Sequence, residues 1–271
     1  MKIKLMIQLI VIISLAGICN LSAGVIVLMN GKLTEKSTGK PIAAKIKFFD
    51  KSGKEHSSNS NSNDGAFQQV LPAGNEFTVV VVGWVVSPEK RKFVIQDYSE
   101  YTEFEKDFDL VEIKPGITLN TAKLFEKNSS GINSESDDFF KYLKLMSKNQ
   151  NGVIFEAAIN SADSYFETKT VKIQVTEKGK RKIKSIKTTT DEQLTQLLNQ
   201  RKVEFLNKLT EFSIPEKSVN IRTELVINKP KPKAKVKSKK KSKKKSIQVI
   251  DTTPGIFPDD VTLKIDKVIK L

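Results

Sequence analysis

Residues 191–211 have the sequence DEQLTQLLNQRKVEFLNKLTE, and this stretch decides the fold of the second half of the chain. Apolar residues return every three or four positions, which is the spacing of one face of an α-helix. No proline or glycine interrupts the stretch. The sequence therefore predicts a long helix. Its apolar side consists of Leu194, Leu197, Leu198, Phe205, Leu206 and Leu209.

Short apolar segments on both sides of this helix have the pattern of β-strands. Turn-forming residues bound them, as they bound the strands of compact domains. The segments are residues 117–120, 153–159, 221–227 and 261–268. An added hairpin is predicted over 165–187, where Val171–Val175 and Ile183–Ile186 flank Glu177–Lys180.

A second helix is predicted in the same half of the chain. Apolar residues recur at helical spacing from Phe139 to Met146, behind Ser136 as the N-cap, and Asn149–Gly152 ends the helix. Together these elements follow the order β-α-β-α-β-β. That order predicts an α+β domain over residues 113–271, with the helices on one face of its sheet.

The first region, residues 24–112, has β patterns throughout. Asn30-Gly31 and Asp50–Gly53 are turn signals, and Asn63–Gly65 closes a hairpin. Strands are predicted at Val25–Met29, Ala44–Phe49, Ala66–Val70 and Phe77–Val82. Short strands with turns at this spacing indicate an all-β sandwich. The chain is therefore predicted to have two domains.

The chain opens with the pattern of a secretory signal peptide. A basic start, Met1–Lys4, precedes an apolar run from Leu5 to Ile18, and small or polar residues follow it. The run is shorter than the roughly 20 apolar residues of a membrane-spanning helix. We therefore expect residues 1–23 to be cleaved after Ala23 and the chain to be exported. A transmembrane anchor is the alternative.

Cys19 leaves another alternative open. The residues Leu-Ala-Gly-Ile-Cys at positions 15–19 resemble a bacterial lipobox, whose cysteine is lipidated. Ile18 departs from that pattern, because a small residue is usual before the cysteine. Cleavage after Ala23 yields a chain without cysteine, whereas lipidation of Cys19 tethers it to a membrane.

The composition argues against several classes of catalysis. The chain has one cysteine and one histidine, His56, in a Ser/Asn-rich stretch that we predict as a solvated loop. Ser-His-Asp, Cys-His and zinc-histidine sites all need an imidazole placed by other residues. No carboxylate pair is singled out either. We therefore expect a binding protein without enzyme activity, metal or cofactor.

The basic character of the chain is local. The formal charge is +15, but residues 229–245 hold 11 lysines, so the rest of the chain carries about +4. We expect a disordered loop over 229–246, between the last two strands, because like charges and prolines prevent a core. Contact with envelope polyanions, such as lipopolysaccharide phosphates or peptidoglycan carboxylates, is expected through Lys239, Lys240, Lys241, Lys243, Lys244 and Lys245.

The lysines allow two other interpretations. Nucleic-acid binding is disfavoured by the export signal and by the lack of interleaved aromatic residues, which stack on bases. A solvated insert without a specific partner is the remaining alternative.

Several motifs in the first region resemble one family. They are Gly31–Thr34, Thr38–Ile42, Ala44–Ile46, Asp64–Phe67, Leu71–Gly74 and Val82-Gly83-Trp84. These motifs are similar to those of the carboxypeptidase-regulatory-like (transthyretin-like) domain, where the last motif is usually Gly-Tyr. The resemblance implies an accessory β-sandwich without peptidase activity. Trp84 is then a core or rim aromatic residue, and a sugar-binding platform is the alternative.

The second region resembles a degenerate OmpA-like domain, the peptidoglycan-associated module of Gram-negative envelopes. The resemblance rests on Leu119-Asn120, Ser134–Ser136, Lys148–Asn151, Leu197–Phe205, Ile214-Pro215 and Val261–Ile265. The tandem of the two domains is similar to that of envelope proteins of the Bacteroidetes group.

This resemblance implies a site for the diaminopimelate residue of the peptidoglycan stem peptide. In the family, an arginine grips its carboxylate with two parallel hydrogen bonds and an aspartate pairs with its ammonium. Arg201 falls at the arginine position, and an exposed helical arginine is the alternative. The family motif Gly-His-Thr-Asp has lost its first three residues here, and Asp163 comes one residue late. Asp163 either serves after a shift of the loop or is a solvated loop residue of a lapsed site.

One functional hypothesis follows, with two alternatives. The chain is expected in the periplasm or at the outer membrane, where it associates with peptidoglycan through Arg201 and Asp163. Outer-membrane proteins are further expected partners, and nucleic acid is not. The second hypothesis is an envelope scaffold or adhesion protein whose peptidoglycan site has lapsed. An enzyme such as a peptidoglycan hydrolase is the third.

Overall fold

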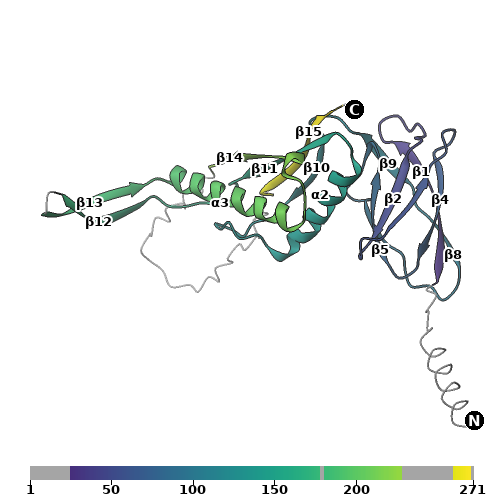
Figure 1. Cartoon of the computed structure of the whole chain (residues 1–271), viewed down its shortest axis with the longest axis horizontal. Coiled ribbons are helices and arrows are strands. Elements are labelled where there is room, and N and C mark those ends of the chain that lie inside the picture. Colours follow the sequence, from purple (N-terminus) through teal and green to yellow (C-terminus); the bar gives the residue numbers. More distant parts are fainter. Residues whose placement is uncertain (1–24, 178–179, 228–258, 270–271) are drawn as a thin grey trace, which may run out of the picture. The chain divides into compact units, whose positions relative to one another are not determined.

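A computed structural model describes residues 25–177, 180–227 and 259–269. The predicted signal segment, Cys19 and the predicted lysine-rich loop lie outside the described residues. The chain divides into two compact units, one containing residues up to 81 together with 89–111, and the other containing 82–88 together with the residues from 112 onward (Figure 1). Each unit is described by itself.

The first unit consists of β-strands, as the sequence predicts. The strands are β1 (Ile26–Glu35), β2 (Lys45–Asp50), β3 (Glu55–Asn59), β4 (Ala66–Pro72), β5 (Glu76–Val81), β7 (Lys92–Val94), β8 (Thr102–Glu105) and β9 (Phe108–Glu112). The short strand β6 (Trp84–Val86) lies in the segment 82–88, and its Trp84 is half-buried, as a rim aromatic residue is.

The long strand β1 connects two groups of strands. Its first part pairs with β4 on one side and β8 on the other, and its last part, Leu33–Glu35, pairs with β9. The second group continues through β2, which pairs with β3 and β5, and β5 also pairs with β7. Aromatic rings fill the space between the strands. Phe48 lies 6.0–6.4 Å from Phe67, Phe93 and Phe108, measured between ring centroids.

The turn predicted at Asn30-Gly31 is wrong, because β1 runs straight through it. Gly31 serves a different purpose there. A Cβ atom added at this position would collide with the backbone oxygen of Lys106 and would lie 2.8 Å from the ring of Phe67. A glycine inside a strand often marks such a close backbone approach. The turn at Asp50–Gly53 is confirmed, since the Gly53 amide donates to the Asp50 carbonyl at 2.9 Å.

His56 is not a solvated loop residue. It lies on β3, opposite Phe48 of β2, and its side chain is half-buried. The imidazole meets the ring of Phe77 edge-on, with the centroids 6.1 Å apart. The polar sequence Glu-His-Ser-Ser-Asn of this edge strand hides the β pattern, because an exposed strand needs few apolar residues.

The second unit contains a four-stranded sheet and two α-helices in the predicted order. Its elements are β10 (Thr118–Ala122), the short 3₁₀ turn η1 (Ser134–Ser136), α2 (Asp137–Asn149), β11 (Val153–Asn160), β12 (Lys169–Glu177), β13 (Lys180–Thr188), α3 (Thr190–Glu211), η2 (Glu216–Ser218), β14 (Val219–Glu224) and β15 (Val261–Val268). The strand order is β10-β15-β11-β14. Strand β11 is parallel to β14 and antiparallel to β15.

The two helices pack together through aromatic rings. Phe139 and Phe140 of α2 lie 6.3 and 5.2 Å from Phe205 of α3. Thr189 caps α3 in a capping box with Glu192, which the sequence did not single out. Ser136 precedes α2 as predicted, but its hydroxyl donates to the Asn133 carbonyl and makes no cap. No helix within the described ranges is long and apolar enough to cross a membrane.

The predicted hairpin is confirmed as strands β12 and β13. Their register runs from Lys169 opposite Thr188 to Glu177 opposite Lys180. Figure 1 shows this two-stranded ribbon projecting from the N-terminal end of α3.

Candidate functional site

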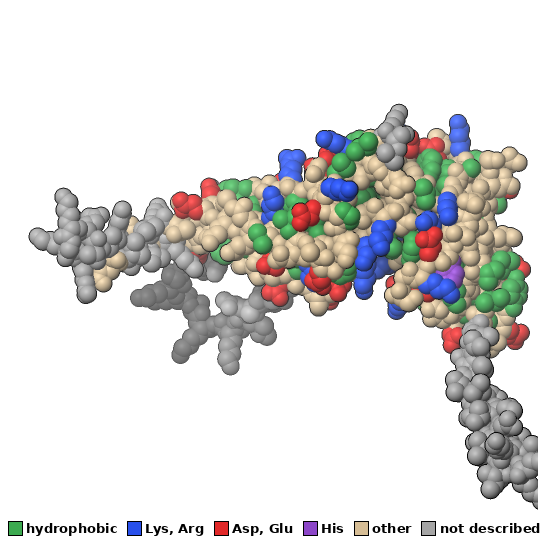
Figure 2. All heavy atoms as spheres, in the orientation of Figure 1, with side chains coloured by type: hydrophobic (Ala, Val, Ile, Leu, Met, Phe, Trp, Pro, Cys, Tyr) green, Lys and Arg blue, Asp and Glu red, His purple; other side chains and the backbone are tan. Residues whose placement is uncertain are grey.

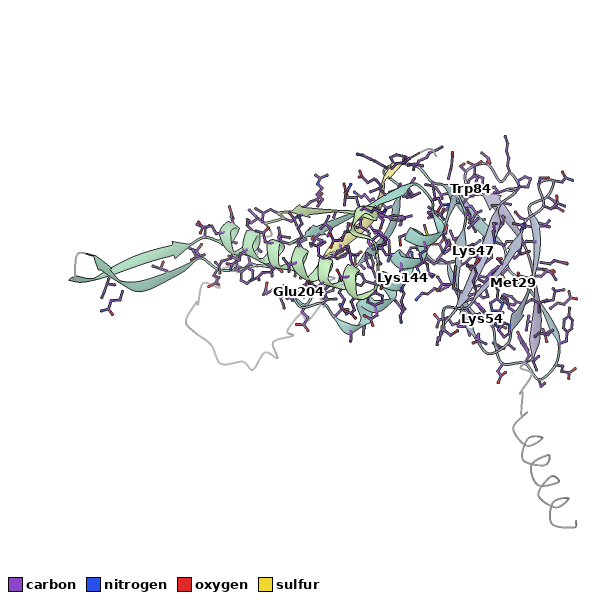
Figure 3. The ribbon with its side chains drawn as sticks, in the orientation of Figure 1. Met29, Lys47, Lys54, Trp84, Lys144 and Glu204 are labelled. Atoms are coloured by element: carbon purple, nitrogen blue, oxygen red, sulfur yellow. The ribbon has the colours of Figure 1, made fainter. Side chains whose placement is uncertain are left out.

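Arg201 lies in the middle of α3 and is fully buried, with a side chain 0 % exposed. Its sequence neighbours Gln200 and Lys202 are exposed, whereas Leu198 and Phe205 on the same side of the helix are buried. Glu204, labelled in Figure 3, lies three residues further along α3 and is exposed. A buried arginine among apolar helix positions is costly unless its charge and all its donors find partners.

The guanidinium of Arg201 is completely engaged. It donates six hydrogen bonds of 2.8–3.2 Å. The acceptors are the carbonyls of Glu126, Ser129 and Asn160, both carboxylate oxygens of Asp163, and the hydroxyl of Ser164. The ring of Phe125 lies against its face, 4.8 Å from Cζ. The side chain has five N–H groups. Nε donates to one acceptor, Nη1 to two and Nη2 to three, so every N–H group has an acceptor.

Asp163 supplies the negative charge of this arrangement. Its two oxygens lie 2.8 and 2.9 Å from the terminal nitrogens of Arg201, in the parallel geometry that suits a guanidinium and a carboxylate. The Asp163 side chain is 0 % exposed. Ser164 donates a further hydrogen bond to it at 3.0 Å.

Two loops close over the ion pair. One follows β11 and carries Asp163, and the other connects β10 to α2. Asn128, at a left-handed φ of 57°, joins the loops. Its amide donates to Ser164, and its side-chain oxygen accepts from the Tyr165 amide at 2.9 Å. The loops themselves cover Arg201, and the β12–β13 hairpin begins only after them.

A second buried carboxylate lies close to the pair. Asp260, immediately before β15, is 0 % exposed and accepts hydrogen bonds from the amides of Leu124 and Phe125 at 2.7 and 2.9 Å. Burial raises the pKa of Asp260, although the two amides and the charge of Arg201 act in the opposite direction. Desolvation of the charged form therefore outweighs its stabilising partners.

This geometry tests the interpretations of the two residues. The structure brings Arg201 and Asp163 together, and their alternative interpretations as an exposed helical arginine and a solvated loop aspartate are wrong. They face each other directly, so neither a carboxylate nor an ammonium of a ligand can reach them in this conformation. The arrangement can tie α3 to two loops, and it presents no free donor to solvent.

The sequence analysis missed Asp260, Ser164 and Phe125. Asp260 and its partner amides lie more than a hundred positions apart in the sequence, so no local pattern connects them. The only available signal was the acidic Asp259-Asp260 pair just before an apolar strand. Among the described residues, no group of histidine, cysteine and acidic side chains could hold a metal ion.

Comparisons with known proteins assign the chain to no family. No family profile and no curated protein matches the sequence. One similar solved structure is the Bacillus anthracis TIE protein, with 14% identity over 60% of this chain and 26% of that one, at a TM-score of 0.25. Another is a 9R-lipoxygenase from Cyanothece PCC8801, with 11% identity over 46% of this chain and 22% of that one, at a TM-score of 0.23. The chain spans about a quarter of either structure, and both likenesses are too weak to carry an argument.

Proposed function

We propose that this chain is a non-enzymatic structural protein of a Gram-negative cell envelope, exported to the periplasm or the outer membrane. In this proposal its second unit is a degenerate OmpA-like domain whose peptidoglycan site has lapsed into an internal tie. One observation carries the proposal: Asp163 occupies both parallel donors of Arg201, and both side chains are 0 % exposed.

The proposal rests on what a carboxylate ligand would need. A diaminopimelate carboxylate requires the same two N–H groups that Asp163 accepts from. Binding would therefore have to break a buried ion pair, at a cost of about 3–5 kcal/mol. That cost lowers the affinity of any such ligand by at least about a hundredfold. Asp163, one residue late relative to the family motif, takes the place of the ligand and leaves no residue for an ammonium.

The family assignment itself is supported by the order of elements and by the resemblance of the sequence motifs. The order β-α-β-α-β-β is found with the hairpin inserted between β11 and α3. The export signal and Cys19 support the location, as does the lysine-rich segment 229–245, which suits envelope polyanions better than nucleic acid.

A peptidoglycan pull-down tests the proposal. The experiment compares the wild type with Arg201→Met/Asp163→Leu, which removes both charges and keeps the volume filled. It is run at about 1 M NaCl, where screening over about 3 Å suppresses contacts by the lysines. We expect no enrichment of either protein over an unrelated control protein.

Saturable binding by the wild type would overturn the proposal if a free diaminopimelate stem peptide competes and the double variant does not bind. That result would favour association with peptidoglycan through Arg201 and Asp163. Binding at low salt that both proteins share would instead report contact between the lysines and wall carboxylates.

A further inference from the structure

An acidic segment runs along one edge of the first unit. Residues 97–112 contain seven acidic residues and one basic residue. Glu100, Glu103 and Glu105 in this segment are exposed, and Figure 2 shows acidic side chains at the end of the unit where Figure 1 places β8. The acidic charge therefore lies on or beside strand β8.

Strand β8 is an edge strand. It pairs with β1 alone among the described strands, so its other side offers unpaired backbone donors and acceptors. Such an edge accepts a further strand unless something opposes the pairing. Glu103 and Glu105 are two residues apart and share one face of β8, so their charges oppose another acidic edge and favour a basic one.

The β12–β13 hairpin has the opposite character. Residues 169–188 contain eight basic residues and one acidic residue. Strand β13 has five basic residues in its sequence and no acidic one. Within the described chain, β12 and β13 pair only with each other, so β13 also has an open edge. Ile183 on this strand is 72% exposed.

An isolated two-stranded hairpin is marginal in water without further packing. This one has an exposed apolar residue and a basic sequence that would attract an anionic partner. An anionic polymer would match the hairpin and leave the acidic β8 edge unmatched. A second copy of this chain matches both edges, with acidic and basic residues at the same spacing of two.

We propose that the chain self-associates head to tail, with the open edge of β13 in one copy adding to the open edge of β8 in the next. Backbone hydrogen bonds join the strands, and Glu103 and Glu105 pair with the basic positions of β13. The contact uses a different surface on each copy, so it is not limited to a dimer.

Sedimentation of the purified full-length protein at increasing concentrations tests this contact. We expect the mass of the wild type to rise with concentration beyond that of a dimer at low salt. It should fall toward the monomer at about 1 M NaCl, where charges are screened over about 3 Å. Glu103→Lys/Glu105→Lys and Lys182→Glu/Lys184→Glu should each weaken association roughly tenfold or more, about 1.4 kcal/mol.

Two controls separate the contact from a general effect of charge. Glu89→Lys/Glu216→Lys changes the net charge as much as the β8 variant, at exposed positions on other segments, and should associate as the wild type does. A mixture of the β8 and β13 variants should associate again, because it unites an unaltered β13 with an unaltered β8. All variants keep the lysines of 229–245, so a loss of association in the β13 variant reports on β13 and not on those lysines.

The proposal is overturned if the wild type stays monomeric at every concentration, or if the β8 and β13 variants associate as strongly as the charge control. Tight binding of polyphosphate by a monomeric wild type, lost in the β13 variant, would overturn it in favour of an anionic polymer. These outcomes are independent of the peptidoglycan pull-down, so either proposal can fail alone.

Discussion

Arg201 is a structural residue in this fold. Its guanidinium has two parallel donors that can grip a carboxylate, and Asp163 of the same chain supplies that carboxylate. Three backbone carbonyls and a hydroxyl complete its shell. A buried charge with every donor satisfied is tolerated, whereas half of the pair alone is not.

Breaking this pair should therefore destabilise the second unit strongly. Asp163→Asn leaves a buried guanidinium without its counter-charge, and we expect the free energy of unfolding to fall by about 3–5 kcal/mol. Urea unfolding measures the change. The matched control is Glu224→Gln, which removes the partner of Arg222 in an exposed pair with side chains 64% and 43% exposed. It should cost at most about 1 kcal/mol.

The double variant Arg201→Met/Asp163→Leu removes the ion pair together with the cost of desolvating its two charges. Replacing a buried ion pair with apolar residues of similar size is often neutral or stabilising by about 1–4 kcal/mol. We expect it to recover most of the stability lost in Asp163→Asn. A double variant that is less stable than Asp163→Asn would show that the backbone carbonyls around Arg201 depend on the guanidinium.

The pH dependence of stability should reveal Asp260. Its pKa is raised above the usual 3.8 in the folded state, so the folded protein binds this proton more tightly than the unfolded chain. Stability from Asp260 is therefore lost as the pH rises from 3.8 through the raised pKa. We expect Asp260→Asn to remove this loss, measured by urea unfolding across the acid range.

Asp109 is the matched control of opposite sign. A hydrogen bond from Lys90 lowers the pKa of Asp109, so its contribution is present above pH 3.8 and is lost as the pH falls. Asp109→Asn should flatten the acid side of the curve instead. Equal pH profiles for wild type and Asp260→Asn would contradict the assignment.

At the scale of elements, Gly31 allows β1 to pass close to the backbone of Lys106, although in the sequence it looks like a turn residue. Gly31→Ala should cost about 1–3 kcal/mol, because the added methyl group collides with the Lys106 carbonyl and the ring of Phe67. Thermal or urea unfolding of the first unit measures the loss. Gly131→Ala, followed by unfolding of the second unit, is the control, since its nearest neighbour is the Ser129 hydroxyl at 3.2 Å, whose rotation would cost only the hydrogen bond that it accepts from the Gly131 amide. A similar cost at both positions would argue against a close approach at Gly31.

At the scale of the whole molecule, the proposed export of the chain can be tested by the processing of its N-terminus. We expect the intact mass of the exported protein to correspond to a chain that begins at Gly24 and contains no cysteine. Edman sequencing or mass spectrometry of the N-terminal peptide gives the result. A chain that begins at Cys19 with the added mass of acyl groups would show a membrane-anchored lipoprotein, and Cys19→Ser should then abolish that mass.

Elements with local signals could be predicted from the sequence alone. The apolar spacing of 191–211 marked α3, and the flanking apolar runs marked the strands of the second unit, because periodicity reports the face that an element buries. Weakly patterned strands escaped, as β3 did, since exposed edge residues need not be apolar. The turn predicted at Asn30-Gly31 was wrong because glycine is favoured both in turns and where two backbones approach closely, and the local sequence does not distinguish the two.

The state of the Arg201–Asp163 site depends on contacts between segments that are far apart in the sequence. The sequence placed Arg201 on a helix and Asp163 after a strand, and the resemblance suggested that they meet. Whether they meet across an open cleft or directly depends on the loops between β10 and α2 and after β11, whose carbonyls and Asn128 close over the guanidinium. The nearby Asp260 likewise reaches its partners only in the folded chain. Burial is a property of the whole packing around a residue, so a charge that looks free in the sequence is fully buried in the fold.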